Sequence, residues 1–189
     1  MPALVPPVLA PGTLGGREQP SLTADDLLLR PWRSADAPAL QAAYDDPGIR
    51  RWHGEHLSDV EASAYADQWR GLWQDERRAG WAVIRDDVLV GRVTLVRLEL
   101  PQGQAEVTYW VVPAARGGGV APRAVLAVAS WCFDDLGLHR LELAHSTQNP
   151  ASCRVAEKAG FVAEGTKRRQ GLHGDGWHDM HLHARLSDD

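Results

Sequence analysis

Cysteine, long apolar runs and basic charge are all scarce in this sequence. The only two cysteines among 189 residues are Cys132 and Cys153, which excludes a disulfide-rich scaffold and favours two free thiols in a reducing compartment. No apolar run approaches the ~20 residues that cross a bilayer. The first residues also lack the basic start and continuous apolar stretch of a signal peptide. We therefore expect a cytoplasmic protein without a membrane partner.

Positive charge is outnumbered, with 20 Lys and Arg against 25 Asp and Glu and a net charge of −5. This balance argues against a nucleic-acid-binding protein, which needs a basic stripe. Tryptophan, in contrast, is abundant, with eight residues. Because a buried indole N–H needs a partner, we expect some of them at a surface groove or interface. They would suit a homodimer or an aromatic acceptor pocket equally well.

Hydrophobic spacing and capping signals divide the chain into one arm and one domain. Residues 1–20 are rich in Pro and Gly and predict a flexible arm that contributes little to the core, followed by a domain over 21–189. In the domain, Ser58 and Glu61 form a capping box for a helix that should run to Ala79 and stop at Gly80. Helices are also expected near 35–45, 120–136 and 150–159. Strands are expected near 27–32, 81–85, 88–98, 106–112, 138–144, 161–165 and 177–186.

The resulting order of elements is β-α-α-β-β-β-α-β-α-β-β. It predicts an α/β (α+β) fold with one mixed, mostly antiparallel sheet and helices on both faces.

The strongest local signal is a glycine-rich turn between a strand and a helix, at residues 111–122. Closely approaching backbone N–H groups and a helix N-terminus favour a diphosphate there. A P-loop is excluded because no Gly-Lys-Ser/Thr follows, and the G-x-G-x-x-G of dinucleotide folds fits poorly. The pattern Q/R-x-x-G-x-G/A is satisfied by Arg116, Gly119 and Ala121. A glycine turn without a ligand is the alternative.

A second motif follows at 149–165, Asn-Pro-Ala-Ser-Cys-Arg-Val-Ala-Glu-Lys-Ala-Gly-Phe-Val-Ala-Glu-Gly. With the glycine turn and the strand Glu106–Val111 before it, this segment resembles the GNAT acyltransferase superfamily. The likeness is to its RimJ/RimL-type branch, which shows N-x-x-S-x-x-V-x-E-K-x-G-F-x-x-E-G. The two motifs stand in the right order, and the likeness extends from about Leu27 to Leu186.

This resemblance implies a splayed sheet with acetyl-CoA, or another short acyl-CoA, bound where the fourth and fifth predicted strands part. The pantetheine arm is expected along the backbone of Trp110, Val111 and Val112. The diphosphate is expected on the amides of Gly117, Gly118, Gly119, Val120 and Ala121. Charge partners and pantetheine contacts are expected from Arg116, Arg123, Asn149 and Arg154.

Acyl transfer to an amine needs a base and a weak acid. An alkyl ammonium with a pKa of ~10.4 must lose a proton, and a thiolate of pKa ~8.5 gains from a donor. Glu106 is the candidate base, against an ordinary strand carboxylate, and Ser152 the candidate acid or sulfur anchor, against a small packing residue. Many superfamily members carry a tyrosine acid later in this helix, where this chain has Ala156 and Glu157. Cys153 is expected to face the core rather than to form an acyl-enzyme.

The acceptor site is expected between the first two predicted helices. The residues expected to shape it are Trp52, His53, Glu55, His56, Trp69 and Trp73, with a nonspecific lid as the alternative. Four late histidines suggest a metal only weakly, because no Cys, Asp or Glu completes a set with recognisable spacing. We therefore expect no metal at these four histidines, which are His173, His178, His181 and His183.

The sequence therefore predicts direct transfer of an acetyl-type group to a primary amine. The acceptor is a protein N-terminus, a lysine or a small-molecule amine. A catalytically silent acyl-CoA sensor is a second hypothesis, kept open by the missing tyrosine. A nucleotide-binding protein using the glycine turn is a third.

Overall fold

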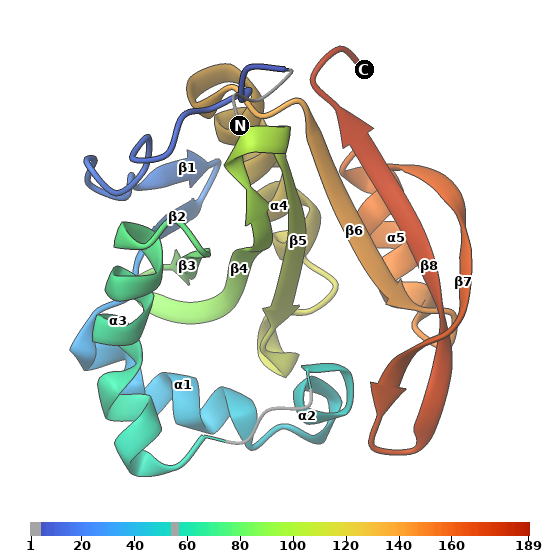
Figure 1. The fold of residues 1–189 in the computed structure, drawn as a ribbon. Helices are drawn as coiled ribbons and strands as arrows, with labels where there is room; N and C mark the ends of the chain where they lie inside the picture. Colours follow the sequence, from blue (N-terminus) through green and yellow to red (C-terminus); the bar gives the residue numbers. More distant parts are fainter. Residues whose placement is uncertain (1–4, 54–56) are drawn as a thin grey trace.

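Eight strands form one sheet in the computed structural model, which describes residues 5–53 and 57–189 (Figure 1). The strands lie in the order β1-β2-β3-β4-β5-β6-β8-β7, and every neighbouring pair is antiparallel except β5 with β6. This confirms the predicted mixed, mostly antiparallel sheet. The strands are β1 (Leu22–Ala24), β2 (Leu27–Pro31), β3 (Ala79–Arg85), β4 (Val88–Glu99), β5 (Gln104–Val111), β6 (Arg140–Ser146), β7 (Val162–His173) and β8 (Gly176–Leu186).

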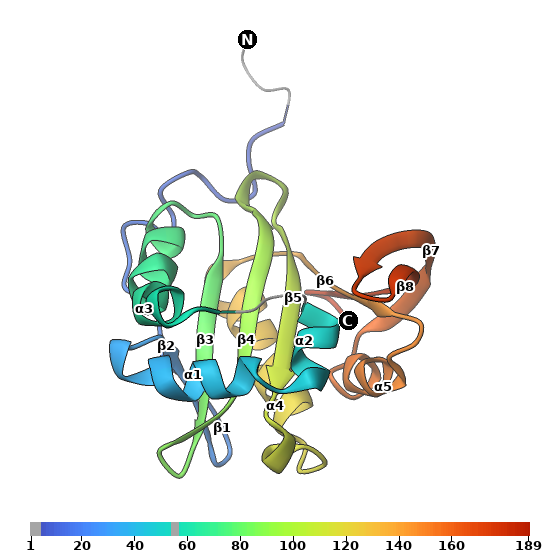
Figure 2. The same ribbon diagram turned by 90° about the horizontal axis from the view of Figure 1, so that it is seen from below.

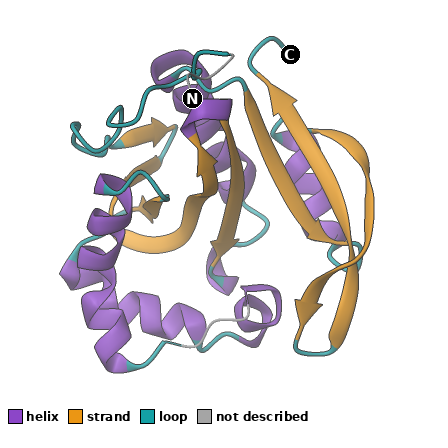
Figure 3. Cartoon of the chain, viewed as in Figure 1, coloured by secondary structure: helices purple, strands orange, loops and turns teal. Residues whose placement is uncertain are grey.

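Helices flank the sheet, with α3 and α5 near its opposite ends (Figures 2 and 3). Two separate cores result. One gathers apolar side chains of the sheet with those of α4 and α5, and the other joins α1, α2 and α3 to β3 and Trp110. The helices are α1 (Ala37–Tyr44), α2 (Pro47–His53), α3 (Asp59–Gln74), α4 (Val120–Ser130), which continues as a π-helical stretch (Trp131–Leu136), and α5 (Pro150–Lys158).

The parallel strands β5 and β6 are paired over only a short stretch. Register pairs join the two strands only at Gln104–Arg140, Ala105–Leu141 and Glu106–Glu142. Beyond Glu106 the strands diverge, as Figure 1 shows, while β5 stays paired with β4 up to Val111. The expected splay between these strands is thus present, and it leaves one edge of β5 without a strand partner over the described residues 107–111.

Several local predictions were wrong. The helix α2 was missing from the predicted order: it begins at Pro47, because Asp46 Oδ1 accepts from the N–H of Ile49 at 2.9 Å and proline suits a first helical position. The helix α3 ends at Gln74 rather than near Ala79, since Glu76 takes a left-handed φ of 56°. The strand β7 extends to His173, well past the predicted end at 165.

The described part of the N-terminal arm, residues 5–20, packs against the domain, which corrects the expectation that it adds little to the core. Leu14 is fully buried in the larger core. The Glu76 carboxylate accepts from the backbone N–H groups of Gly12 at 2.6 Å and Leu14 at 2.5 Å. Trp73 Nε1 donates to the carbonyl of Arg17 at 2.7 Å. The left-handed turn at Glu76 thus serves to hold the arm.

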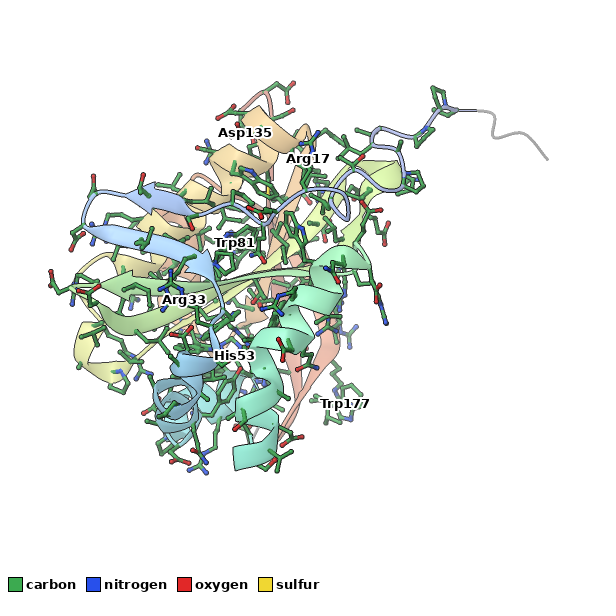
Figure 4. The ribbon with its side chains drawn as sticks, turned by 90° about the vertical axis from the view of Figure 1, so that its left-hand side faces the viewer. Arg17, Arg33, His53, Trp81, Asp135 and Trp177 are labelled. Atoms are coloured by element: carbon green, nitrogen blue, oxygen red, sulfur yellow. The ribbon has the colours of Figure 1, made fainter. Side chains whose placement is uncertain are left out.

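Of the eight tryptophans only Trp177 is exposed, at 60%, and it projects from the end of the β7–β8 hairpin (Figure 4). Trp81, at 0% exposure, lies inside the molecule in the same view. An interface built from several exposed tryptophans is therefore absent from this fold. Among the helices of the described residues, none has the length and apolar character needed to span a bilayer.

Candidate active site

A cavity of about 590 Å³ opens where β5 and β6 diverge. Its walls come from β5, β6, the start of α4, one side of α5 and the helix α2. The site residues expected from the sequence that line it are Trp52, His53, Glu106, Trp110, Val111, Arg116, Gly117, Gly119, Val120, Ala121, Asn149, Ser152 and Arg154. The fold thus brings most of the predicted site together from α2, β5, the glycine turn with the start of α4, and α5.

The glycine turn has the conformation that its sequence predicts. Gly117 and Gly119 take left-handed φ values of 82° and 72°, and α4 begins directly afterwards at Val120. The unpaired N–H groups of the first turn of α4 therefore face the cavity, where Val120 and Ala121 are lining residues. Gly118 belongs to the turn without lining the cavity. This end of the cavity fits a diphosphate.

Two arginines near this turn, Arg116 in the cavity lining and Arg123 on α4, both have acidic partners. Arg116 donates to the Val111 carbonyl at 3.0 Å and pairs with Asp46 at 2.7 Å. Arg123 pairs with Asp25 and Asp26 in the β1–β2 turn and does not line the cavity, so the expectation that it contacts the cofactor is wrong in this conformation.

Two other basic side chains line the cavity wall formed by α5. Arg154 and Lys158 are exposed, four residues apart and on the same helix face. Lys158 was not singled out from the sequence, although its spacing from Arg154 was the available signal.

The open edge of β5 offers backbone groups to the cavity. The N–H of Val112 bonds to the carbonyl of Val90 on β4 at 3.0 Å. Since backbone groups of successive residues alternate between the two edges of a strand, those of Val111 and Tyr109 face the opening. Val112 itself lies outside the cavity lining, and the Trp110 side chain is buried in the smaller core. Val111 is thus the residue best placed to pair with an extended ligand.

Glu106 lies near the start of β5, and its side chain is only 13% exposed. Its carboxylate accepts from Arg97 Nη1 at 2.5 Å. Burial raises the pKa of Glu106, and the nearby Glu142 raises it further, while Arg97 opposes the shift. A carboxyl with an upward-shifted pKa beside a cavity is suited to accept a proton.

Tyr109 and Ser152 meet across the cavity between β5 and α5. Their hydroxyl oxygens are 2.7 Å apart. Asn149 caps α5 by accepting from the Ser152 N–H at 3.2 Å, which fixes the position of this turn. Burial raises the pKa of Tyr109 to about 12, so its hydroxyl stays protonated at neutral pH. Tyr109 was not predicted from the sequence, because the family pattern placed the tyrosine in the helix rather than on the strand opposite it.

The helix α2 borders the cavity with Trp52 and His53. Burial lowers the pKa of His53 to about 3, with a contribution from the positive charge of Arg92, so the ring is neutral. His53 hydrogen-bonds to the backbone of Tyr109 and lies inside the molecule in Figure 4. Glu55 and His56 lie outside the described residues.

Trp69 and Trp73 are not acceptor-site residues. Both are buried on α3, at 6% and 3% exposure, and neither lines the cavity. Trp69 packs against Gly80, where a Cβ would lie 2.6 Å from its ring, and Trp73 packs in the larger core near Trp131. Their helical spacing marked a buried face, which the sequence alone could not distinguish from a ligand-binding face.

A second cluster of polar side chains lies between α5 and the strands β6 and β8, and one of its members, His145, also lines the cavity. It consists of His145, Cys153, His181 and His183, whose potential ligand atoms all lie within 4.8 Å of one another. The spacing in the sequence did not indicate such a set, yet in the fold a cysteine joins two of the late histidines. His145 and Cys153 are distant from them in sequence but adjacent in the fold. Burial lowers the pKa of both His145 and His183.

Comparisons with known proteins agree with this architecture. The family described as "Acetyltransferase (GNAT) domain" matches residues 26–162. The N-acetyltransferase YoaA of Bacillus subtilis is 31% identical over 154 residues, covering 79% of this chain and 87% of that protein. The ribosomal-protein-serine acetyltransferase of Escherichia coli is 28% identical over 106 residues, covering 56% of this chain and 59% of that protein.

Solved structures show the same fold. RimL, the ribosomal L7/L12 alpha-N-protein acetyltransferase, solved with coenzyme A, superposes with a TM-score of 0.82 at 18% identity, covering 88% of this chain and 98% of that one. Mycobacterium smegmatis RimJ, solved with a CoA-disulfide, superposes with a TM-score of 0.78 at 25% identity, covering 89% and 87%. The chain therefore belongs to the GNAT acetyltransferase family, with a ribosomal-protein-serine acetyltransferase among its relatives, and is an N-acetyltransferase that uses acetyl-CoA.

Proposed function

We propose that this enzyme transfers an acetyl group directly from acetyl-CoA, bound along β5, to the N-terminal amine of a protein. The observation that carries the proposal is the placement of polar groups on the two faces of β5. Glu106 and Tyr109 are three residues apart, so they point to opposite faces of the strand. A base on one face and a hydroxyl pair on the other flank the opening between β5 and β6.

Acetyl-CoA is held by backbone groups and a few cations. The pantetheine arm pairs with the open edge at Val111, and the diphosphate rests on the N–H groups of Gly117 to Ala121. Arg154 and Lys158 supply positive charge on the α5 side, where the phosphates have no other basic partner among the cavity-lining residues except Arg116. The amide of Asn149 borders the same channel.

Glu106 accepts the proton that the attacking ammonium must lose, directly or through a water molecule. The free amine then attacks the thioester carbonyl carbon, forming the C–N bond. A backbone N–H on the open edge of β5 stabilises the oxyanion. The C–S bond breaks, and the electron pair leaves with sulfur.

Tyr109 and Ser152 receive the developing thiolate. With a pKa of about 12, Tyr109 is too weak an acid to protonate fully a thiolate of pKa ~8.5, but it remains a hydrogen-bond donor throughout. Its hydroxyl and that of Ser152 act as one pair: one hydroxyl donates to the other, which donates to sulfur. The proton released by the amine returns to the thiolate through solvent.

The choice of a protein N-terminus rests on the relatives, since the Escherichia coli protein is a ribosomal-protein-serine acetyltransferase. Trp52 and His53 on α2 border the acceptor side, and the neutral ring of His53 does not repel an incoming ammonium. We expect the reaction to take place in the cytoplasm, where the two free cysteines would persist as thiols.

The test is release of free thiol from acetyl-CoA with three acceptor sets: peptides with free Ser or Ala N-termini, N-terminally blocked peptides containing lysine, and small polyamines. We expect turnover with the first set, and a fall in kcat of about 10²–10⁴-fold in Glu106→Gln. Turnover with only the blocked peptides or the polyamines would replace the proposed acceptor while keeping the enzyme. Equal kcat for Glu106→Gln and the wild type would eliminate Glu106 as the base.

A further inference from the structure

Four side chains from three elements converge between α5 and the sheet. One of them, His145, also borders the cavity, and none has a role in the proposed acetyl transfer. His145 comes from β6, His181 and His183 from β8, and Cys153 from the first turns of α5. His145 and His183 are 5% and 1% exposed, whereas Cys153 and His181 are partly buried. The strand register brings them together, because His145 is paired with His181 and its neighbour Leu143 with His183.

The spacing of these atoms is close to that of a tetrahedral metal site. With Zn–N of about 2.0–2.1 Å and Zn–S of about 2.3 Å, tetrahedral ligands lie about 3.3–3.6 Å apart. Here His145 Nε2 and His183 Nε2 are 3.2 Å apart, and Cys153 Sγ is 3.9 Å from His183 Nε2. All four ligand atoms fall within 4.8 Å of one another. Binding of one zinc ion would require atoms that lie up to 4.8 Å apart to approach to about 3.3–3.6 Å.

One surrounding contact orients His145 as a metal requires, whereas Nδ1 of His183 is buried without a hydrogen-bond partner among the described residues. His145 Nδ1 lies 2.8 Å from the Ser146 carbonyl, which can only accept. The Nδ1 must therefore carry the proton, which leaves the lone pair of Nε2 pointing at His183. An outer hydrogen bond from the second ring nitrogen to a backbone carbonyl is typical of metal-bound histidine. Cys153 Sγ also lies 3.7 Å from the Glu157 carboxylate, which adds negative charge beside the site.

We propose that His145, Cys153, His181 and His183 bind one Zn²⁺ ion. Three imidazole nitrogens and one thiolate form a complete tetrahedral set, so no position is open for substrate or a reactive water. Such a closed set is typical of structural zinc rather than catalytic zinc.

The ion would join α5 to the sheet at a position that matters for the active site. Cys153 is the neighbour of Ser152 in the first turns of α5, and α5 lies against β6 and β8 (Figure 1). Asn149 and Ser152, which border the cavity, precede Cys153 on the same helix. A zinc ion held by Cys153 would thus fix the cavity wall formed by α5 relative to β6.

The experiment uses the full chain with any affinity tag removed. Metal is stripped with a chelator, and the apo protein is titrated with Zn²⁺ in competition with a chromophoric chelator and, separately, with Co²⁺ followed by absorbance. The site variants are Cys153→Ala and His183→Gln. The matched controls are Cys132→Ala, a thiol in the core, and His139→Gln, an exposed histidine.

We expect the wild type and both controls to bind one Zn²⁺ ion per chain tightly. The site variants should lose at least about 100-fold in Zn²⁺ affinity, which is more than the usual effect of removing a residue that only hydrogen-bonds to a metal ligand. Co²⁺ should produce a thiolate charge-transfer band and strong tetrahedral d–d bands that disappear in Cys153→Ala. Wild-type affinity no greater than that of Cys153→Ala would overturn the proposal, as would a Co²⁺ complex without a thiolate band.

A second measurement covers the case in which a variant does not fold. In wild-type protein Cys132 is inaccessible, so a thiol reagent reacts with Cys153 first. Zn²⁺ should slow alkylation at Cys153, located by peptide mass, and leave the slow reaction of Cys132 unchanged. Equal alkylation of Cys153 with and without Zn²⁺ would also reject the site.

Discussion

The hydroxyl groups of Tyr109 and Ser152, 2.7 Å apart, should act as a single unit in the acetyl transfer. Tyr109→Phe removes one oxygen and keeps the ring. We expect it to lower kcat by about 10–100-fold, with little change in KM for the amine, because the hydrogen bond to the leaving thiolate forms only as the C–S bond breaks.

The double variant Tyr109→Phe/Ser152→Ala distinguishes this role from packing. Two members of one hydrogen-bonded unit are not additive, so the double variant should be scarcely slower than the worse single variant. Steady-state kcat for all four proteins completes the cycle. Additive losses would mean that the two hydroxyls act independently.

The pKa of Glu106 should set the acidic limb of the pH profile. Burial raises this pKa, and the base must be ionised, so kcat/KM should fall as pH decreases through a value above the ~4.3 of free glutamate. Arg97 opposes that shift, so Arg97→Gln should move the limb to higher pH. Arg70→Gln, on the exposed face of α3, should leave it unmoved.

The pH dependence of the stability contribution of Glu106 has the opposite sign to the pH dependence of kcat/KM. The folded protein holds the Glu106 proton more tightly than the unfolded chain, so this contribution to the unfolding free energy is full at low pH and is lost as pH rises through the raised pKa.

Profiles of kcat/KM in which Arg97→Gln shifts the limb downward, or not at all, would contradict the assignment of the limb to Glu106.

At single residues the sequence predicted well wherever a motif fixed the backbone. The start of α5 could be predicted at Asn149-Pro150, because a cap followed by a first-turn proline fixes the backbone, whereas the proposed role of Asn149 came from the resemblance. Trp69 and Trp73 were misassigned, since helical spacing identifies an apolar face without saying what it packs against. Tyr109 was missed because its partner, Ser152, is 43 positions away in the chain and only the fold brings them together.

Among the elements, the glycine turn before α4 yields a test with an internal control. Gly117 takes a φ of 82°, and a Cβ added there would meet no atom within 4 Å, so Gly117→Ala would be strained without any clash. Gly118 is not left-handed, and its Cβ would meet only ordinary contacts at 3.7 and 3.8 Å.

We therefore expect Gly117→Ala to lose about 1–2 kcal/mol of unfolding free energy, and Gly118→Ala much less. Because the strained turn presents the N–H groups at the start of α4, Gly117→Ala should also raise the Kd for CoA. Denaturant unfolding and calorimetry measure the two effects. Equal behaviour of the two variants would show that the turn adapts to a side chain.

The ends of helices were predictable where the sequence contains a clear capping motif. The box of Ser58 and Glu61 begins α3 as expected, with the Ser58 N–H donating to the Glu61 carboxylate at 2.9 Å. The end of α3 was not predictable, because Glu76 leaves the helix to bind Gly12 and Leu14 in a distant segment. The length of β7 was not predictable either. Its register with β8 shifts twice, and each shift interrupts the alternation of side chains by which a strand is recognised in a sequence.

For the whole molecule, the split between β5 and β6 followed from the resemblance, whereas the packing of distant segments did not. The four side chains of the proposed zinc site come from β6, α5 and β8, and no spacing in the sequence relates Cys153 to His183. The same is true of the arm, whose composition indicated disorder while one apolar side chain, Leu14, fixes it to the core.

That anchoring can be tested by one substitution. Leu14 is 0% exposed in the larger core, so Leu14→Ala should reduce the unfolding free energy by about 2–5 kcal/mol, the usual cost of truncating a buried leucine. Val8→Ala, at a position 50% exposed, should stay within about 0.5 kcal/mol of the wild type. Denaturant unfolding of the three proteins provides the comparison. If Leu14→Ala were as stable as Val8→Ala, the arm would be an appendage, and the fold would depend on residues 21–189 alone.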